Sequence, residues 1–184
     1  LVKAFGADAL RAYLMFFARW DLGGPWSSGG IEGVNRWLRR VWNVFLEPAA
    51  GRPVGEDVTR SLRRKVHQTL RAVTHDFEQV EFNTIVSGLM ELLNEMVHLK
   101  GKVSASPAWA EAVEIYTQMM APVVPHIAEE IWQRCGKPYS VHTSRWPEVD
   151  EAAAAVEEIT LVVQVNGKVR DRITVPADIT DEEA

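Results

Sequence analysis

The segment Met120-Ala121-Pro122-Val123-Val124-Pro125-His126-Ile127-Ala128-Glu129-Glu130-Ile131-Trp132 places two prolines close together between two apolar, helix-like patterns. Proline lacks a backbone N–H and is therefore accommodated best in the first turn of a helix. We predict that one helix ends before Pro122 and that the next begins at Pro125. Glu129 and Glu130 would then lie near the positive end of the new helix dipole. Taken alone, the segment describes a tight corner between two packed helices.

Helical periodicity on both sides of this corner predicts a bundle. Apolar residues recur every three or four positions in several stretches, which is typical of amphipathic helices. We expect Asp8 to cap the first helix and Asn83 to cap the fourth. The predicted helices span residues 8–19, 31–45, 56–78, 83–100, 107–121 and 125–134. Long amphipathic helices joined by short turns form an antiparallel bundle, so the fold class is mainly α.

The pattern changes after Pro147. Residues 151–158 form an acidic, alanine-rich linker, and two β-rich runs then flank Asn166-Gly167, a strong signal for a β-hairpin. We favour a three-residue loop, Val165-Asn166-Gly167. That register gathers the apolar side chains on one face, with Asp171 as the exception, and it places three cations on the other. These cations are Lys168, Arg170 and Arg172.

Composition sets broader bounds. The chain has 184 residues, of which 47% are apolar and 24% charged, as expected for one globular domain with or without a small appendage. Cys135 is the only cysteine, so no internal disulfide can form, which agrees with a cytoplasmic location. No apolar run approaches the roughly 20 residues that span a bilayer. The chain begins at Leu1 inside a periodic stretch and stops after the capping box Thr180–Glu183, so we expect a fragment of a longer protein.

The positive charges are segregated, although the net charge is −5. No acidic residue occurs between Val58 and His75, and this stretch carries Arg60, Arg63, Arg64, Lys65, His67 and Arg71. The predicted helix 31–45 adds Arg36, Arg39 and Arg40. A charged helix face is most often simply solvated. Basic stripes on an acidic chain nevertheless favour a polyanion that docks on one side.

Residues for catalysis or metal binding are not evident in the sequence. No two of the five histidines stand at the four-residue helical spacing of a zinc site, and no glycine-rich phosphate loop follows a predicted strand. We expect His126, at a helix start, to cap or pack rather than act as a base. Cys135 lacks the surroundings of a nucleophile and is expected to be a small apolar residue near a helix end. We therefore assign no catalytic residue and no metal ligand.

Four segments occur in a particular order along the chain. They are Gly6–Phe16 with the following Trp26-Ser27, then Phe82-Asn83-Thr84, then Pro125–Glu130, and finally Val165-Asn166-Gly167-Lys168-Val169-Arg170. Together they resemble the C-terminal third of bacterial leucyl-tRNA synthetases, which are class I aminoacyl-tRNA synthetases. Each motif is weak alone, but their shared order extends the resemblance over nearly the whole chain.

The resemblance implies a division of the chain. Residues 1–30 would be a linker and stem-contact segment, in which Trp26 is buried against the bundle and Ser27 or Ser28 caps the second helix. Residues 31–147 would be the helical anticodon-binding bundle, and residues 148–158 a linker. Residues 159–184 would begin a truncated α+β C-terminal domain that contacts tRNA.

The resemblance also implies function. The parent enzyme would join leucine to its tRNA with ATP and magnesium, whereas this fragment would hold no cofactor and would be inactive. The expected partners are leucine-accepting tRNA and the catalytic and editing domains of the same chain, with no membrane and a monomeric state. The implied tRNA-binding residues are Arg36, Arg39, Arg40, Arg63, Arg64, Lys65, Lys168, Arg170 and Arg172.

Two alternatives stay open at this point. One is the equivalent region of a valyl-, isoleucyl- or methionyl-tRNA synthetase, against which the Asn-Gly-Lys-Val-Arg hairpin argues. The other is a non-catalytic helical interaction module without a nucleic-acid role. That module would tolerate alanine at Arg63, Arg64, Lys168 and Arg170 with no effect on tRNA binding.

Overall fold

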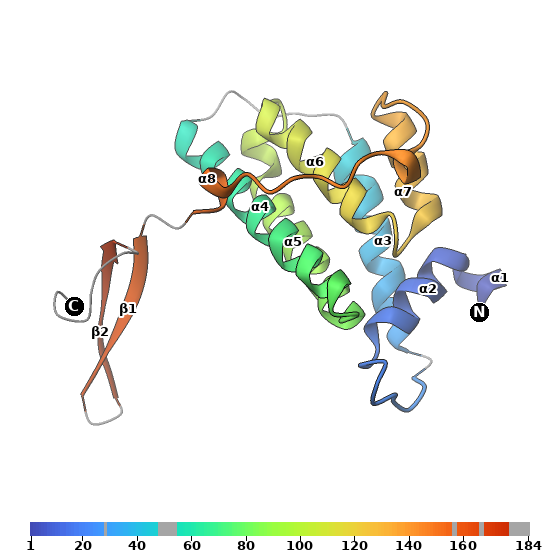
Figure 1. Ribbon diagram of the computed structural model, residues 1–184, viewed down its shortest axis with the longest axis horizontal. Helices are drawn as coiled ribbons and strands as arrows, with labels where there is room; N and C mark the ends of the chain where they lie inside the picture. The colour runs from blue at the N-terminus through green and yellow to red at the C-terminus, as the bar shows by residue number, and fades with distance from the viewer. Residues whose placement is uncertain (28, 48–54, 156–157, 166–167, 177–184) are drawn as a thin grey trace.

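The computed structural model describes residues 1–184 except 28, 48–54, 156–157, 166–167 and 177–184. The described part is mainly helical (Figure 1). Its helices are α1 (Val2–Phe5), α2 (Ala7–Phe16), α3 (Gly30–Leu46), α4 (Glu56–Glu78), α5 (Phe82–Val103), α6 (Pro107–Met120), α7 (Pro125–Arg134), the 3₁₀ helix η1 (Val141–Thr143) and α8 (Glu151–Ala154). Two strands follow, β1 (Glu158–Val165) and β2 (Lys168–Pro176). The Thr180–Glu183 capping box lies outside the described residues.

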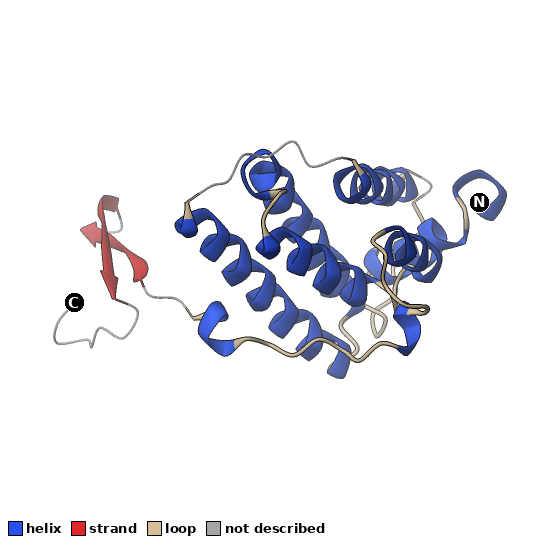
Figure 2. Cartoon of the chain, turned by 90° about the horizontal axis from the view of Figure 1, so that it is seen from above, coloured by secondary structure: helices blue, strands red, loops and turns tan. Residues whose placement is uncertain are grey.

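The helices lie side by side (Figure 2), and short turns join α4 to α5, α5 to α6 and α6 to α7. The long helices α4 and α5 run antiparallel because only residues 79–81 join them. The next helix, α6, packs on both, while α3 packs on α2, α5 and α7. The predicted helical bundle is therefore confirmed for the described residues.

Both prolines that were expected to start helices do so. Pro107 is the first residue of α6 and Pro125 is the first residue of α7. The start of α6 is also capped, since the Ser106 hydroxyl accepts a hydrogen bond from the Trp109 N–H. The helix α4 has the predicted bounds, and its apolar stripe is buried at Leu62, Val66, Leu70 and Val73. Burial of this stripe fixes the rotation of α4 against its neighbours.

The predicted caps were wrong at three helices. Asp8 lies inside α2, whose N-cap is Gly6, and its carboxylate instead accepts hydrogen bonds from the first turn of α7. The N-cap of α5 is Glu81 rather than Asn83. The N-cap of α3 is Gly29, without a side-chain hydrogen bond.

Two tryptophans near the start are exposed, although Trp26 was expected to be buried. The helix α2 ends at Phe16, so Trp20 lies in the following turn and is 61% exposed, and Trp26 is 46% exposed. The buried aromatic residue here is Tyr13. Its hydroxyl donates to the Ser27 carbonyl at 2.7 Å and accepts from the Ser27 N–H at 3.1 Å. Tyr13 therefore fastens the loop between α2 and α3, and the Trp26 ring lies edge-on to it with ring centroids 5.0 Å apart.

The backbone of β1 and β2 forms an antiparallel ladder (Figure 1). Val165 pairs with Lys168, and the register shifts after Gln164 so that Val163 pairs with Asp171. A three-residue loop that begins at Val165 is incompatible with that pairing, so the expected loop was wrong. The Asn166-Gly167 turn itself lies outside the described residues.

Candidate nucleic-acid interface

Arg63 of α4 is held between two carboxylates. Its guanidinium donates to both carboxylate oxygens of Glu111 on α6, at 2.7 and 3.1 Å. It also donates to Asp150 Oδ2 at 2.9 Å. The two-pronged contact suits the planar guanidinium. An arginine with two carboxylate partners has little positive charge left for a phosphate.

His67 completes this group from one turn further along α4. Its imidazole is only 3% exposed, and Nδ1 accepts the backbone N–H of Asp150 at 3.1 Å. The other nitrogen, Nε2, lies 3.3 Å from Glu111 Oε1. Since Nδ1 accepts a hydrogen bond, Nε2 carries the proton and donates it to Glu111. Both ring nitrogens of His67 therefore have a hydrogen-bond partner.

The charged side chains of this group shift one another's pKa values. Hydrogen bonding from Arg63 holds the pKa of Glu111 below its ordinary value, against the opposing effect of burial. The pKa of Asp150 is also lowered, first by the Ala153 N–H that it accepts and then by Arg63. Glu111 in turn raises the pKa of Arg63. All three groups are stabilised in their charged forms.

The remaining cations of α4 differ among themselves. Arg71 forms an ion pair with Glu151 at the start of α8. Arg64 is half-buried, and its Nε has no hydrogen-bond partner among the described residues. Lys65 is half-buried and lines a cavity of about 150 Å³ together with Glu91 of α5. Of the predicted tRNA-binding residues on α4, Arg64 and Lys65 thus form no ion pair with a carboxylate in the contacts that the structure describes.

The cations of α3 lie on its exposed face. Arg36 and Arg39 are exposed and form no ion pair within the described part of the chain. Arg40 is exposed as well and donates to Asn94 Oδ1 of α5 at 2.9 Å. An amide partner leaves the charge of Arg40 uncompensated. We refer to Arg36, Arg39 and Arg40 as the open α3 cations.

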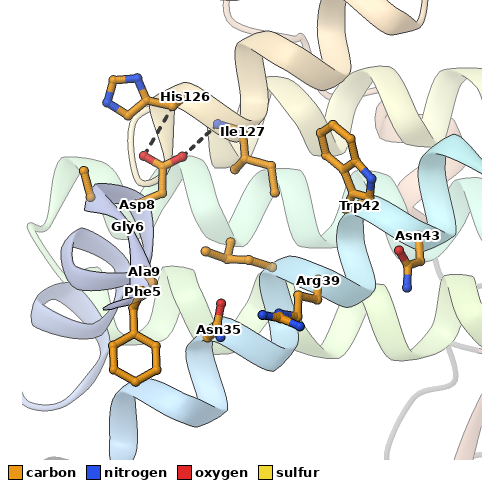
Figure 3. Close-up of a pocket in the computed structure, with 12 residues that line it drawn as sticks. Phe5, Gly6, Asp8, Ala9, Asn35, Arg39, Trp42, Asn43, His126 and Ile127 are labelled. Atoms are coloured by element: carbon orange, nitrogen blue, oxygen red, sulfur yellow. Dashed lines mark hydrogen bonds between the residues drawn. The ribbon is translucent and has the colours of Figure 1, made fainter. Parts of the chain in front are cut away.

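A cavity of about 580 Å³ lies beside Arg39 (Figure 3). Asn35, Trp42 and Asn43 line it from α3. On the opposite wall the Asp8 carboxylate accepts the Ile127 N–H at 2.7 Å and the His126 N–H at 3.4 Å. This contact joins α2 to the start of α7 through the backbone N–H of His126, and the residue itself is exposed.

In β2, Arg170 is exposed. The structure describes only the backbone of Lys168 and Arg172, at the two ends of the bulged stretch. The nine predicted residues therefore fall into an α3 group, an α4 group and a hairpin group. Arg63 alone among them is bonded to two carboxylates in the contacts that the structure describes.

The prediction from sequence missed Glu111 and Asp150, which organise the α4 group. Asp150 did carry a local signal, since an aspartate before Glu151-Ala152-Ala153-Ala154 is a typical helix N-cap, and its carboxylate accepts the Ala153 N–H at 3.0 Å. Glu111 carried none, because its partners lie on another helix.

The described residues offer no cluster of three or more His, Cys, Asp or Glu side chains suited to a metal ion. Among the same residues, no helix is both long enough and apolar enough to cross a membrane. What the described site does offer is positive charge on α3, α4 and the hairpin, which can bind an anion.

Comparison with known proteins agrees with this arrangement. Residues 59–184 match the family described as the anticodon-binding domain of tRNA ligase. The chain is 50% identical over its whole length to a leucine–tRNA ligase of Deinococcus radiodurans and 46% identical to one of Dehalococcoides mccartyi. It spans only 22% and 23% of those proteins.

A solved structure shows the same fold. It is the ternary complex of a LeuRS from Agrobacterium radiobacter K84 with tRNA and LeuAMS. The match covers 98% of this chain and 24% of that one, with a TM-score of 0.81 and 30% sequence identity. Family, sequence and structure agree, and the chain belongs to the anticodon-binding domain family of tRNA ligases.

Proposed function

We propose that this chain is the tRNA-binding part of a leucyl-tRNA synthetase, and that the open α3 cations contact the tRNA backbone. The observation that carries the proposal is the uncompensated charge of Arg36, Arg39 and Arg40 on one face of α3. Phosphate contacts of this kind supply affinity and fix the register of a nucleic acid. Lys65 and Arg64 of α4 and Arg170 of the hairpin extend the same interface, together with Lys168 and Arg172.

The relatives support the leucine assignment. Those named here are leucine–tRNA ligases, and the solved relative was crystallised with tRNA. We infer that the parent enzyme joins leucine to its tRNA with ATP and magnesium, which other parts of the longer protein would bind. We further propose that the parent acts in the cytoplasm and that this part is monomeric.

The test is a binding titration of leucine-accepting tRNA against the chain at several salt concentrations. The variant Arg36→Ala/Arg39→Ala/Arg40→Ala should bind more weakly. The slope of log affinity against log salt should fall by about 0.7–0.9 for each phosphate contact that is lost. Arg19→Ala is the matched control, because Arg19 is exposed but already paired with Asp21 at 2.7 Å.

The outcomes separate the hypotheses. Equal binding by the triple variant and the unmodified chain would remove α3 from the interface. No binding of any tRNA would favour a helical interaction module instead. In the full-length parent, pyrophosphate exchange stimulated by leucine alone would support the leucine assignment, whereas stimulation by valine, isoleucine or methionine would replace it.

A further inference from the structure

The chain from Ser144 to Ala154 is bonded along the bundle instead of hanging free. We call residues 144–154 the strap; it runs back over α6 and α4 to α8 (Figure 1). The Gln118 amide of α6 donates to the Arg145 carbonyl at 2.9 Å. The Trp146 indole donates to Thr74 Oγ1 of α4 at 2.9 Å and lies edge-on to Phe77, with ring centroids 5.5 Å apart.

Asp150 is the central attachment of the strap. Its backbone N–H goes to His67, one carboxylate oxygen accepts from Arg63, and the other caps α8. Glu111 holds the Arg63 and His67 side chains from the opposite side. We call Arg63, His67, Glu111 and Asp150 the Asp150 cluster. Both the backbone and the side chain of Asp150 are therefore tied to the bundle.

The helix α8 is attached as well. The Gln68 amide donates to the Ala154 carbonyl at 3.0 Å, and Arg71 pairs with Glu151. Strand β1 begins at Glu158. Four residue steps from Ala154 reach at most about 14 Å. The attachment of α8 therefore restricts where the hairpin can start.

We propose that the Asp150 cluster positions the β1–β2 hairpin for tRNA, and that Arg63 and His67 are positioning residues which do not touch the nucleic acid. This inference rests on the proposed function and deepens it. Part of the basic stripe of α4 then serves the interface indirectly, because Arg63, His67 and Arg71 hold the strap. The hairpin that the strap carries contacts phosphate through Arg170.

Replacing a carboxylate of the cluster tests this proposal, because the two explanations predict opposite changes in tRNA affinity. If the cluster were only a neighbouring charge, removal of a carboxylate would strengthen the binding of a polyanion. If the cluster positions the hairpin, Asp150→Ala and Glu111→Gln should each weaken tRNA binding, by threefold or more. Glu78→Gln is the matched control, since Glu78 is an exposed carboxylate on α4 and should leave affinity unchanged or slightly raised. Thermal unfolding monitored by circular dichroism verifies that each variant is folded.

A double-variant cycle tests whether Asp150 affects tRNA binding through the hairpin. With Lys168→Ala/Arg170→Ala/Arg172→Ala as background, the penalty of Asp150→Ala should shrink to less than twofold, because the hairpin no longer contributes phosphate contacts. A penalty that persists in full, or tighter binding by folded Asp150→Ala, would overturn the proposal.

A measurement without tRNA separates failure of this inference from failure of the proposed function. Cys135 is the only cysteine and is exposed, so it can carry one dye, and Arg170→Cys can carry the other. Energy transfer should give a narrower distance distribution in the chain with an intact Asp150 cluster than with Asp150→Ala. Identical distributions would refute the attachment of the strap whether or not the chain binds tRNA.

Discussion

The Trp37 indole N–H donates to the Tyr116 hydroxyl at 2.9 Å, and both side chains are buried. The same hydroxyl donates to the Leu89 carbonyl at 2.8 Å. One oxygen thus satisfies polar groups from α3 and α5 from its place on α6. Burial raises the pKa of Tyr116 far above its ordinary value, so the hydroxyl stays protonated in the folded bundle.

Tyr116→Phe should therefore lower the free energy of unfolding by about 1–3 kcal/mol, because a buried N–H and a buried carbonyl lose their partner. Urea denaturation followed by circular dichroism measures the loss. Tyr139→Phe is the control, since Tyr139 is 83% exposed and should change stability by less than about 0.5 kcal/mol. Equal stability of the two variants would contradict the role given to this hydrogen bond.

Gly30 should not tolerate a side chain, whereas its neighbour Gly29 should. A Cβ at Gly30 would lie 2.5 Å from Cε2 of Tyr13, and that ring is fixed by its two hydrogen bonds to Ser27. Among the described residues other than its chain neighbours, no atom lies within 4 Å of a Cβ at Gly29. We expect Gly30→Ala to cost about 1–3 kcal/mol of stability and Gly29→Ala to be nearly neutral in the same denaturation assay. A neutral Gly30→Ala would mean that Tyr13 can move.

Val80 has a left-handed backbone, with φ of 61°, in the turn between α4 and α5. A β-branched residue is strained in this region, and Val80 is 56% exposed, so little packing offsets the strain. Val80→Gly should raise the free energy of unfolding by about 1 kcal/mol. The comparison is Val97→Gly, an exposed position inside α5, which should lose about 0.5–1 kcal/mol instead. Destabilisation by both substitutions would show that Val80 is held in the turn by its side chain.

Lowering the pH should reduce the contribution of the Asp150 cluster to the free energy of unfolding. The folded pKa of Glu111 lies below its ordinary value of 4.5, so its stabilising effect is complete above that value and is lost as the pH falls through the folded pKa. Urea denaturation between about pH 6 and pH 3 should show this loss. In Glu111→Gln the pH dependence should be shallower, and Glu78→Gln should retain the original dependence. Parallel curves for all three proteins would exclude Glu111 as a source of acid sensitivity.

Local signals in the sequence predicted the helices well. Pro107 and Pro125 start their helices where expected, because a missing N–H and a fixed φ act within one turn. The apolar stripe of α4 became the buried stripe, since helical spacing alone puts those side chains on one face. The caps failed where a distant group was the better partner, as with Asp8 and the N-terminus of α7.

The sequence by itself determined the six longest helices and which face of each is apolar, whereas the short helices α1, η1 and α8 were not predicted. Only the tertiary structure decided which cations stay open. Arg63 and Arg36 look alike in the sequence, but Arg63 meets Glu111 and Asp150, which are 48 and 87 residues away along the chain. Helical periodicity is a local property, whereas charge pairing depends on which helices the fold brings together, and the spacing of residues carries no record of that.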